Sequence, residues 1–231
     1  MKKAVVLAGS LILAFAFCVP LVAQPNAKSV ETQVIDNFDT DAPWQWSAQG
    51  SRMCTTGYPI VKKFEGIPNS LVPLQKPDVK AMVLGMKTKF NRKGDNWVEI
   101  YPTKDGKPFE YEFVGTVKQI DVWVWGANYN YTLEMMVRDG NGRVYVLPVT
   151  DLNYKGWKEC IVTIPTSILQ HSTLRSGRPN MSFVGFRVRS GADAPVDDFV
   201  IYFDNLLYAT NTLDSIYDGY TLQRQDFGDN K

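Results

Sequence analysis

Residues 117–149 decide the fold, and they read VKQIDVWVWGANYNYTLEMMVRDGNGRVYVLPV. Apolar and polar side chains alternate in this stretch with a period of two, which is typical of strands and not of helices. Val122 and Val124 point to one face, whereas Trp123 and Trp125 point to the other. Alternation of this kind predicts strands that bury one face in a hydrophobic core.

Two clusters of turn-forming residues divide this stretch. Residues 126–130 (GANYN) separate the first run from the second, and residues 139–142 (DGNG) separate the second from the third. Glycine, asparagine and aspartate tolerate the positive φ values that tight reversals need. We therefore predict a three-stranded antiparallel meander at the centre of a β-sandwich.

The rest of the chain continues this pattern and shows neither a long helical period nor an internal repeat. Loops are predicted at 43–46, at the proline-rich segment 57–77, and at 166–180, where one helical turn is expected at 166–171. Further strands are predicted at residues 34–39, 82–90, 97–101, 109–113, 159–164, 182–190 and 198–208. This spacing indicates an all-β fold, a two-sheet antiparallel β-sandwich of jelly-roll or galactose-binding-like type with long surface loops.

The first residues are predicted to be a targeting segment. Two lysines precede an apolar run that ends in small residues, as in a secretory signal peptide. Lipidation at Cys18 is the alternative, but Phe17 before it is too bulky for the small residue that lipid attachment needs. We expect residues 1–23 to be removed, which leaves residues 24–231 as a single β-sandwich domain with a polar C-terminal tail from about residue 214.

Composition bounds the classes of function. The formal net charge is +1, and removal of the two lysines near the N-terminus takes it to −1. A nearly neutral exported protein has no sign of nucleic-acid binding, and its weak self-repulsion permits dense self-association. The apolar run is short for a membrane span, so no membrane insertion is expected.

Two cysteines, Cys54 and Cys160, remain after the predicted cleavage. An oxidising compartment makes a disulfide between them a candidate. The alternative is a pair of buried free thiols, because the sequence does not establish that the two side chains are close in space.

The sequence offers little for catalysis. His171 is the one histidine and lies in a polar loop, so a serine or cysteine nucleophile would lack a histidine base. Paired carboxylates could support glycoside hydrolysis, and the candidates are Glu110 with Glu112 and Asp197 with Asp198. Any β protein this rich in acidic residues offers such pairs, so we expect a protein that is not an enzyme.

Asp36, Asp39 and Asp204 lie near the first and the last strands, which pair in many sandwiches. They could hold a structural calcium, which takes six or more oxygen ligands. The sequence has no dense acidic loop, so we expect Asp204 to form hydrogen bonds at a sheet edge instead. No metal site and no cofactor is therefore expected.

The two tryptophans are the most informative side chains. If the valines face the core, Trp123 and Trp125 lie on the outer face of their sheet, where a ligand, another protein or a loop should cover them. Aromatic rings stack on sugars in sugar-binding modules, and they anchor protein interfaces. The loop at 57–77 is the candidate cover within the chain. The opposite orientation, with the tryptophans inward, stays open.

Basic side chains form a second candidate surface. Arg187 and Arg189 project from one predicted strand and Arg138 from another, either as a stripe that docks an acidic partner or as a solvated face. The candidate contact residues are Lys62, Lys63, Arg92, Lys93, Trp123, Trp125, Arg175, Arg178, Arg187 and Arg189.

Several segments carry a family resemblance. They are KTKFNRKGDNWVEIYP (87–102), IDVWVWGANYNYTLEMMVRDGNGRVYVLP (120–148), NYKGWK (153–158), MSFVGFRVR (181–189) and DDFVIYFDNL (197–206). Together, and in this order, they resemble the flagellar filament outer layer (sheath) proteins of spirochaetes, the FlaA family. The similarity covers residues 34–220. IDVWVWG and DDFVIYFDNL alone also occur, in looser form, in carbohydrate-binding sandwiches.

The resemblance implies a non-enzymatic structural subunit. Members of this family are exported by a signal peptide and coat the flagellin core of the periplasmic flagella, which affects filament stiffness, helical shape and motility. The implied partners are core flagellin proteins, further copies of the chain and other sheath proteins. The rival interpretation is a secreted carbohydrate-binding β-sandwich module, which would bind sugars through Trp123 and Trp125.

Overall fold

The computed structural model describes residues 30–172, 174, 180–212, 222 and 225. The strands and the one short 3-10 helix of this part of the chain are β1 (Glu31–Asp36), β2 (Gln45–Gly50), β3 (Ile60–Glu65), η1 (Val72–Leu74), β4 (Met82–Thr88), β5 (Trp97–Lys104), β6 (Lys107–Pro108), β7 (Tyr111–Glu112), β8 (Thr116–Ala127), β9 (Tyr131–Arg138), β10 (Val144–Asp151), β11 (Lys155–Thr163), β12 (Ser182–Ser190) and β13 (Phe199–Asn211). The predicted signal peptide and nearly all of the predicted polar tail lie outside the described residues.

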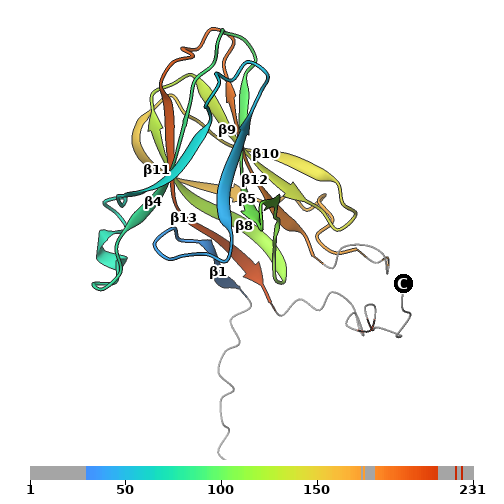
Figure 1. Cartoon of the computed structure of the whole chain (residues 1–231). Helices are drawn as coiled ribbons and strands as arrows, with labels where there is room; N and C mark the ends of the chain where they lie inside the picture. The colour runs from blue at the N-terminus through green and yellow to red at the C-terminus, as the bar shows by residue number, and fades with distance from the viewer. Residues whose placement is uncertain (1–29, 173, 175–179, 213–221, 223–224, 226–231) are drawn as a thin grey trace, which may run out of the picture.

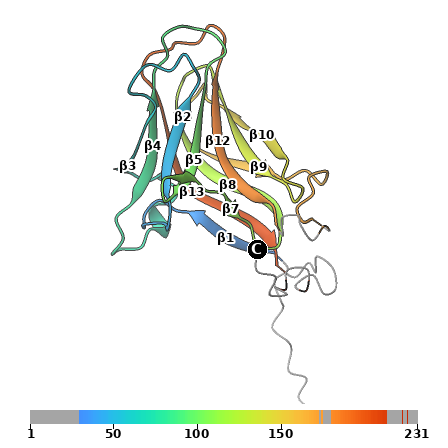
Figure 2. The same ribbon diagram turned by 45° about the vertical axis from the view of Figure 1, so that its right-hand side comes forward.

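The strands form two antiparallel sheets, which confirms the predicted sandwich (Figure 1). Sheet A has six strands in the order β11-β8-β13-β4-β3, and β1 also pairs with β13. Sheet B has seven strands in the order β10-β9-β12-β5-β2, with β6 beside β5 and β7 beside β12. Figure 2 shows β3 and β4 on one side of the molecule and β9 and β10 on the other. Within the described residues, no helix has the length and apolar character needed to span a membrane.

The hydrophobic core lies between the two sheets because each strand turns alternate apolar side chains inward. Val122 and Val124 of β8 are completely buried, as predicted. Aromatic rings connect the layers, since Phe186 of β12 stacks on Phe203 of β13 with the ring centroids 4.7 Å apart. Burial of one such side chain contributes about 1.5–3 kcal/mol, so the facing apolar rows hold the sheets together.

The predicted meander is wrong in its first connection. β8 belongs to sheet A, whereas β9 and β10 pair in sheet B, so residues 128–130 cross from one sheet to the other. Two strands that each turn apolar side chains toward the core can be neighbours in one sheet or can face each other from opposite sheets. The alternation of apolar and polar residues is the same in both arrangements, so it does not distinguish them. The second reversal is as predicted. Asp139 Oδ1 accepts hydrogen bonds from the amides of Asn141 and Arg143, and Gly142 has a φ of 87°.

Two segments predicted as loops contain strands. β2 begins at Gln45, and β3 lies within the proline-rich segment 57–77 and pairs with β4 at the edge of sheet A. Pro59 and Pro68 flank β3 without interrupting it, so they remove no ladder hydrogen bond. The helical turn expected at 166–171 is also wrong, because this segment is turn and irregular structure.

Candidate functional site

An aromatic row crosses the outer face of sheet A. Trp157 of β11, Trp125 of β8 and Tyr202 of β13 are direct neighbours in the strand register, and Phe64 of β3 follows them. The ring centroids of Trp125 and Tyr202 are 5.4 Å apart, and those of Tyr202 and Phe64 are 5.8 Å apart. Both pairs meet edge to face, which is a favourable aromatic geometry. We call these four residues the aromatic row.

The aromatic row is only partly covered by the rest of the chain. Phe64 is 45% exposed, and Ile60, which lies near it on β3, is 38% exposed. The other three members of the row are intermediate between buried and exposed. Several partly exposed aromatic side chains gathered on one sheet face are typical of an interaction site.

Gly85 of β4 makes room for the row. It lies opposite Tyr202 in the register, and it follows Trp157, Trp125 and Tyr202 across the sheet. A Cβ atom at Gly85 would lie 2.8 Å from ring atoms of both Phe64 and Tyr202. The missing side chain therefore lets these two rings meet above β4.

The predicted outward orientation of Trp123 and Trp125 is confirmed, and the inward alternative is wrong. The two tryptophans alternate along β8 with Val122 and Val124, which are fully buried. The predicted cover by residues 57–77 is realised only in part. Phe64 from that segment contacts Tyr202, but it does so as a partly exposed strand residue.

A carboxylate pair lies beside the aromatic row. Asp121 of β8 and Glu159 of β11 flank Trp123, one along the strand and the other across the sheet. Burial, followed by the nearby Glu159 carboxylate, raises the pKa of Asp121 to about 6. Oδ1 of Asp121 is buried and has no hydrogen-bond partner among the described residues. Asp121 Oδ1 therefore gives the face one unused hydrogen-bond acceptor beside Trp123.

The predicted arginine stripe lies on sheet B, and its members form ion pairs. Arg187 Nη2 lies 2.6 Å from Glu99 Oε1, and Gln49 Nε2 donates to the other oxygen of Glu99 at 2.8 Å. Arg189 Nη2 lies 2.9 Å from Asp95 Oδ1. These contacts neutralise the stripe locally, so they favour a solvated, self-paired face over a surface that docks an acidic partner.

The other predicted basic residues are dispersed. Lys62 of β3 is exposed and lies opposite Gly85, at the end of the aromatic row. Lys63 donates a hydrogen bond to a backbone carbonyl at 3.0 Å. Arg92 and Lys93 are exposed in the turn between β4 and β5. The candidates that lie outside the described residues are Arg175 and Arg178.

The carboxylates proposed for glycoside hydrolysis are engaged elsewhere. Glu110 accepts hydrogen bonds from an arginine and a serine, and Glu112 accepts one from an asparagine. Asp197 and Asp198 each lie 2.9 Å from a lysine nitrogen. His171 Nδ1 is 3.1 Å from an asparagine side-chain oxygen. The sequence-predicted acidic pairs therefore act as surface ion-pair and hydrogen-bond partners.

The candidate disulfide does not form, because Cys54 and Cys160 are both free thiols. Cys54 Sγ lies 3.4 Å from Thr88 Oγ1 of β4, whereas Cys160 lies on β11. Two strands separate β4 from β11, which corresponds to about 14 Å at the usual strand spacing. A disulfide needs Cα atoms within about 7 Å. Burial raises the pKa of the Cys160 thiol to about 11, so it is a poor nucleophile.

Sequence reasoning missed three of the four members of the aromatic row. Tyr202 alternates with the buried Ile201 and Phe203, so the period of two already placed its ring on the outer face. Trp157 and Phe64 gave no such signal, because their registers depend on pairing with distant strands. The row could therefore be anticipated from the two central strands but not from the edges.

These features define a class of protein. The chain is an all-β, two-sheet sandwich with one partly exposed aromatic face and one face whose arginines are ion-paired. The chain belongs to the family of the flagellar filament outer layer protein FlaA, which it matches over residues 27–216. Membership of this family supports a structural role in the outer layer of the flagellar filament.

Relatives agree with this assignment. A flagellar filament outer layer-like protein of Brachyspira hyodysenteriae is 28% identical over 184 residues, which cover 80% of this chain and 81% of the relative. The flagellar filament outer layer protein of Borreliella burgdorferi is 29% identical over 102 residues, or 40% of this chain and 30% of the relative. That of Treponema pallidum is 29% identical over 115 residues, or 46% of this chain and 33% of the relative.

Solved structures share the architecture at low similarity. A carbohydrate-binding module of the β-sandwich superfamily superposes with a TM-score of 0.46 at 15% identity, covering 75% of this chain and 60% of that chain. The family 11 carbohydrate-binding module of a Clostridium thermocellum cellulase gives 0.43 at 12% identity, covering 81% and 98%. Likeness at this level concerns the two-sheet fold alone.

Proposed function

We propose that this protein is a non-enzymatic structural subunit that coats the flagellin core of the flagellar filament in the periplasm, and that the aromatic row docks it there. Family membership supports the outer layer as its place. The aromatic row supports docking on the flagellin core, because Phe64 and its neighbour Ile60 are exposed in the isolated chain. A filament surface that covers them would remove this apolar area from water.

The chemistry of the two outer faces favours sheet A as the docking face. Tryptophan and tyrosine are enriched among residues that dominate binding energy, where their loss costs about 2 kcal/mol or more. Exposed ion pairs such as Arg189 with Asp95 contribute little, because the charges are already compensated and solvated. The arginines of sheet B would have to give up their present partners to bind another protein.

Contacts between copies of the chain would complete the layer. A subunit docked on a helical core repeats at the spacing of the core, so each copy meets its neighbours through the same pair of surfaces. Head-to-tail contacts that do not close build helical arrays. Such an array would stiffen the filament and influence its helical shape, and through these properties it would affect motility. Other sheath proteins are further partners in this proposal.

Co-sedimentation tests the proposal directly. The purified protein is mixed with flagellin core filaments from which the outer layer has been removed, and the pelleted fraction is measured over a range of concentrations. Saturable pelleting that requires the filaments is the expected result. A chain that stays in the supernatant, both alone and with other sheath proteins added, would contradict the proposal.

A carbohydrate-binding module is the second candidate function. The observation in its favour is the neighbourhood of Trp123, where aromatic rings lie beside the acceptors of Asp121 and Glu159. Sugars are bound by stacking on such rings and by hydrogen bonds from their hydroxyl groups. This candidate predicts saturable sugar binding in solution that Trp123→Ala or Trp125→Ala abolishes. Filament pelleting that soluble sugars leave unchanged would favour the sheath subunit.

A further inference from the structure

Asp204 and Asn205 lie at a seam in sheet A. One edge of β13 pairs with β4 over Phe199–Phe203 and with β1 from Leu206 onward. Asp204 and Asn205 fall between these two partners, and Asn205 takes a positive φ of 50°. The register of β13 with β8 also shifts after Asp204. The side chain of Asp204 is therefore set apart from the regular ladder.

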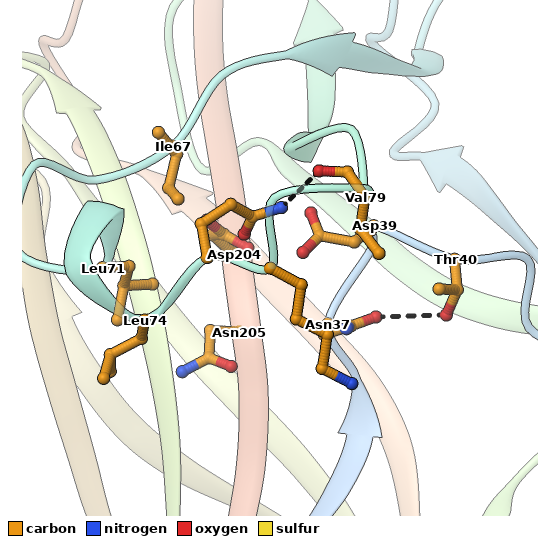
Figure 3. A pocket seen from close by; sticks show the side chains of 11 residues that line it. Asn37, Asp39, Thr40, Ile67, Leu71, Leu74, Val79, Asp204 and Asn205 are labelled. Carbon is orange, nitrogen blue, oxygen red and sulfur yellow. Dashed lines mark hydrogen bonds between the residues drawn. The ribbon is translucent and has the colours of Figure 1, made fainter.

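The seam opens into a cavity of about 180 Å³ (Figure 3). Asp204 and Asn205 form one wall, Asn37 and Asp39 from the β1–β2 connection form another, and the loop around η1 closes the third side. Figure 3 shows the carboxyl group of Asp39 directed into this space, toward β13, which carries Asp204. The cavity thus gathers side-chain oxygens from segments that are far apart in the sequence.

Asp204 is buried without the partners that other buried carboxylates have. It is 4% exposed, as is Asp36, but Asp36 accepts hydrogen bonds from the amide of Phe38 and the indole of Trp46. No described side chain donates to Asp204, and its own neighbour Asn205 offers a backbone amide. Burial, together with the nearby Asp39 carboxylate, raises the pKa of Asp204 to about 7. Asp204 thus has the backbone hydrogen bond expected of it, from Asn205, but no side-chain donor among the described residues.

Asp39 also keeps an oxygen available. Its Oδ1 accepts the amide hydrogen of Met82 at the start of β4, at 2.8 Å, and this bond orients the carboxylate. Within the described part of the chain, Oδ2 has no hydrogen bond. Two nearby carboxylates in a largely buried site repel each other unless a proton or a cation lies between them.

We propose that this cavity is a calcium site in which the carboxylates of Asp39 and Asp204 and the amide oxygen of Asn205 are protein ligands. Calcium prefers oxygen ligands and accepts six to eight of them in irregular geometry, with water completing the set. Magnesium demands a near-ideal octahedron of shorter bonds, which oxygens from three separate segments do not readily provide. A bound calcium would tie the β1–β2 connection and the loop around η1 to the seam of sheet A.

Lys76 is the competing cation at this site. It lines the same cavity, but within the described residues it forms no ion pair with Asp39 or Asp204. A flexible ammonium can approach one carboxylate, whereas calcium can bridge two of them. A shared proton is the other competitor. Calcium should displace both at neutral pH.

Isothermal titration calorimetry tests the proposal on protein from which metal has been removed by a chelator. We expect saturable calcium binding that Asp39→Asn and Asp204→Asn each weaken about tenfold or more, because each removes a charged ligand. Asp78→Asn is the matched control, since Asp78 is exposed in the same loop region and does not line the cavity. At a calcium concentration about a hundredfold above Kd, the Tm should rise by roughly 5–10 °C.

The outcomes separate calcium from its competitors. Asp204→Asn should raise the Tm of the calcium-free protein, because it removes a desolvated charge, and should abolish the further rise with calcium. Retained calcium binding in both ligand variants, or none in the wild type, would overturn the proposal. An equal response to magnesium would overturn the assignment of calcium. Because filament binding is measured separately, failure here leaves the proposed sheath role unaffected.

Discussion

The two outer faces of the sandwich arise from the same alternation but have opposite chemistry. On sheet A, the outward positions of neighbouring strands carry Trp157, Trp125 and Tyr202, which pack on one another and remain partly exposed. On sheet B, the corresponding cross-strand row includes Glu99 and Arg187, which pair at 2.6 Å. The arginines of sheet B find partners within the chain, whereas sheet A leaves a row of aromatic side chains partly exposed.

This difference shows why charge alone misidentified the candidate surface. The arginines of β12 are conspicuous in the sequence, but their partners lie 88 and 94 residues away and become visible only in the fold. The aromatic residues are less conspicuous because each belongs to a different strand. Their significance lies in the register, which aligns them across the sheet.

The largest expected effect is on filament binding. Phe64→Asp places a charge on the exposed end of the aromatic row and should weaken binding to core filaments about 30-fold or more, the loss typical of an interface anchor. Val146→Asp is the matched control, since Val146 is a 41% exposed valine that faces outward on sheet B. Co-sedimentation measures both, and circular dichroism confirms folding. Equal losses in the two variants would remove the distinction between the faces.

The next effect is on stability. Gly85→Ala should lower the free energy of unfolding by about 2 kcal/mol, because the new Cβ would meet the rings of Phe64 and Tyr202 at 2.8 Å. In Gly66→Ala, the new Cβ would meet only Val83, at an ordinary 3.5 Å, so little change is expected. Urea unfolding measures both variants. A Gly85→Ala variant as stable as the wild type would contradict this prediction, because it would show that the rings of Phe64 and Tyr202 can shift to accommodate the new Cβ atom at little cost.

A smaller effect is expected on sheet B. Arg187→Gln should cost about 1–2 kcal/mol, because it leaves the partly buried Glu99 carboxylate without its cation. Arg189→Gln should stay within about 0.5 kcal/mol, since Asp95 is 70% exposed on its side chain. Chemical unfolding gives both values. Neither variant should change filament binding, and a loss of pelleting with either would restore the arginine face as a docking surface.

The fold class followed from the sequence because the period of two is a local property. It placed Val122 and Val124 inward and Trp123 and Trp125 outward without knowledge of any partner strand. The crossing from β8 to β9 could not be predicted in this way, because both strands face the same core from opposite sheets.

The candidate site was harder to predict than the fold. Phe64 lies in β3, which was predicted to be loop because of the prolines that flank it. Trp157 is placed in the aromatic row only by the pairing of β11 with β8. The environment of Asp204 depends on where β4 ends and β1 begins along one edge of β13, which no local pattern specifies. Features that depend on strand register, or on the place where one strand partner ends and the next begins, can be identified only when the pairing of the strands is known.

The smallest expected effect is a pH dependence that belongs to sheet A. Burial and Glu159 raise the pKa of Asp121 to about 6 in the folded protein, from 3.8 in an exposed carboxyl, so the folded state holds this proton more tightly than the unfolded state. The contribution of the protonated Asp121 to the free energy of unfolding is fully present below the unfolded pKa of 3.8, and it is lost as the pH rises through about 6. After allowance for partial exposure it amounts to about 1 kcal/mol between pH 5 and pH 8.

The measurement is the free energy of unfolding against pH for the wild type and Asp121→Asn in the presence of a chelator. Asp204 is present in both proteins, so its titration cancels and the difference between the two curves reports the pair of Asp121 and Glu159. Asp151→Asn, an exposed change on sheet B, should run parallel to the wild type. A difference curve that is flat from pH 5 to pH 8 would show that the Asp121 carboxyl is solvated. In that case the outer face of sheet A would be more open around Trp123 than its burial indicates.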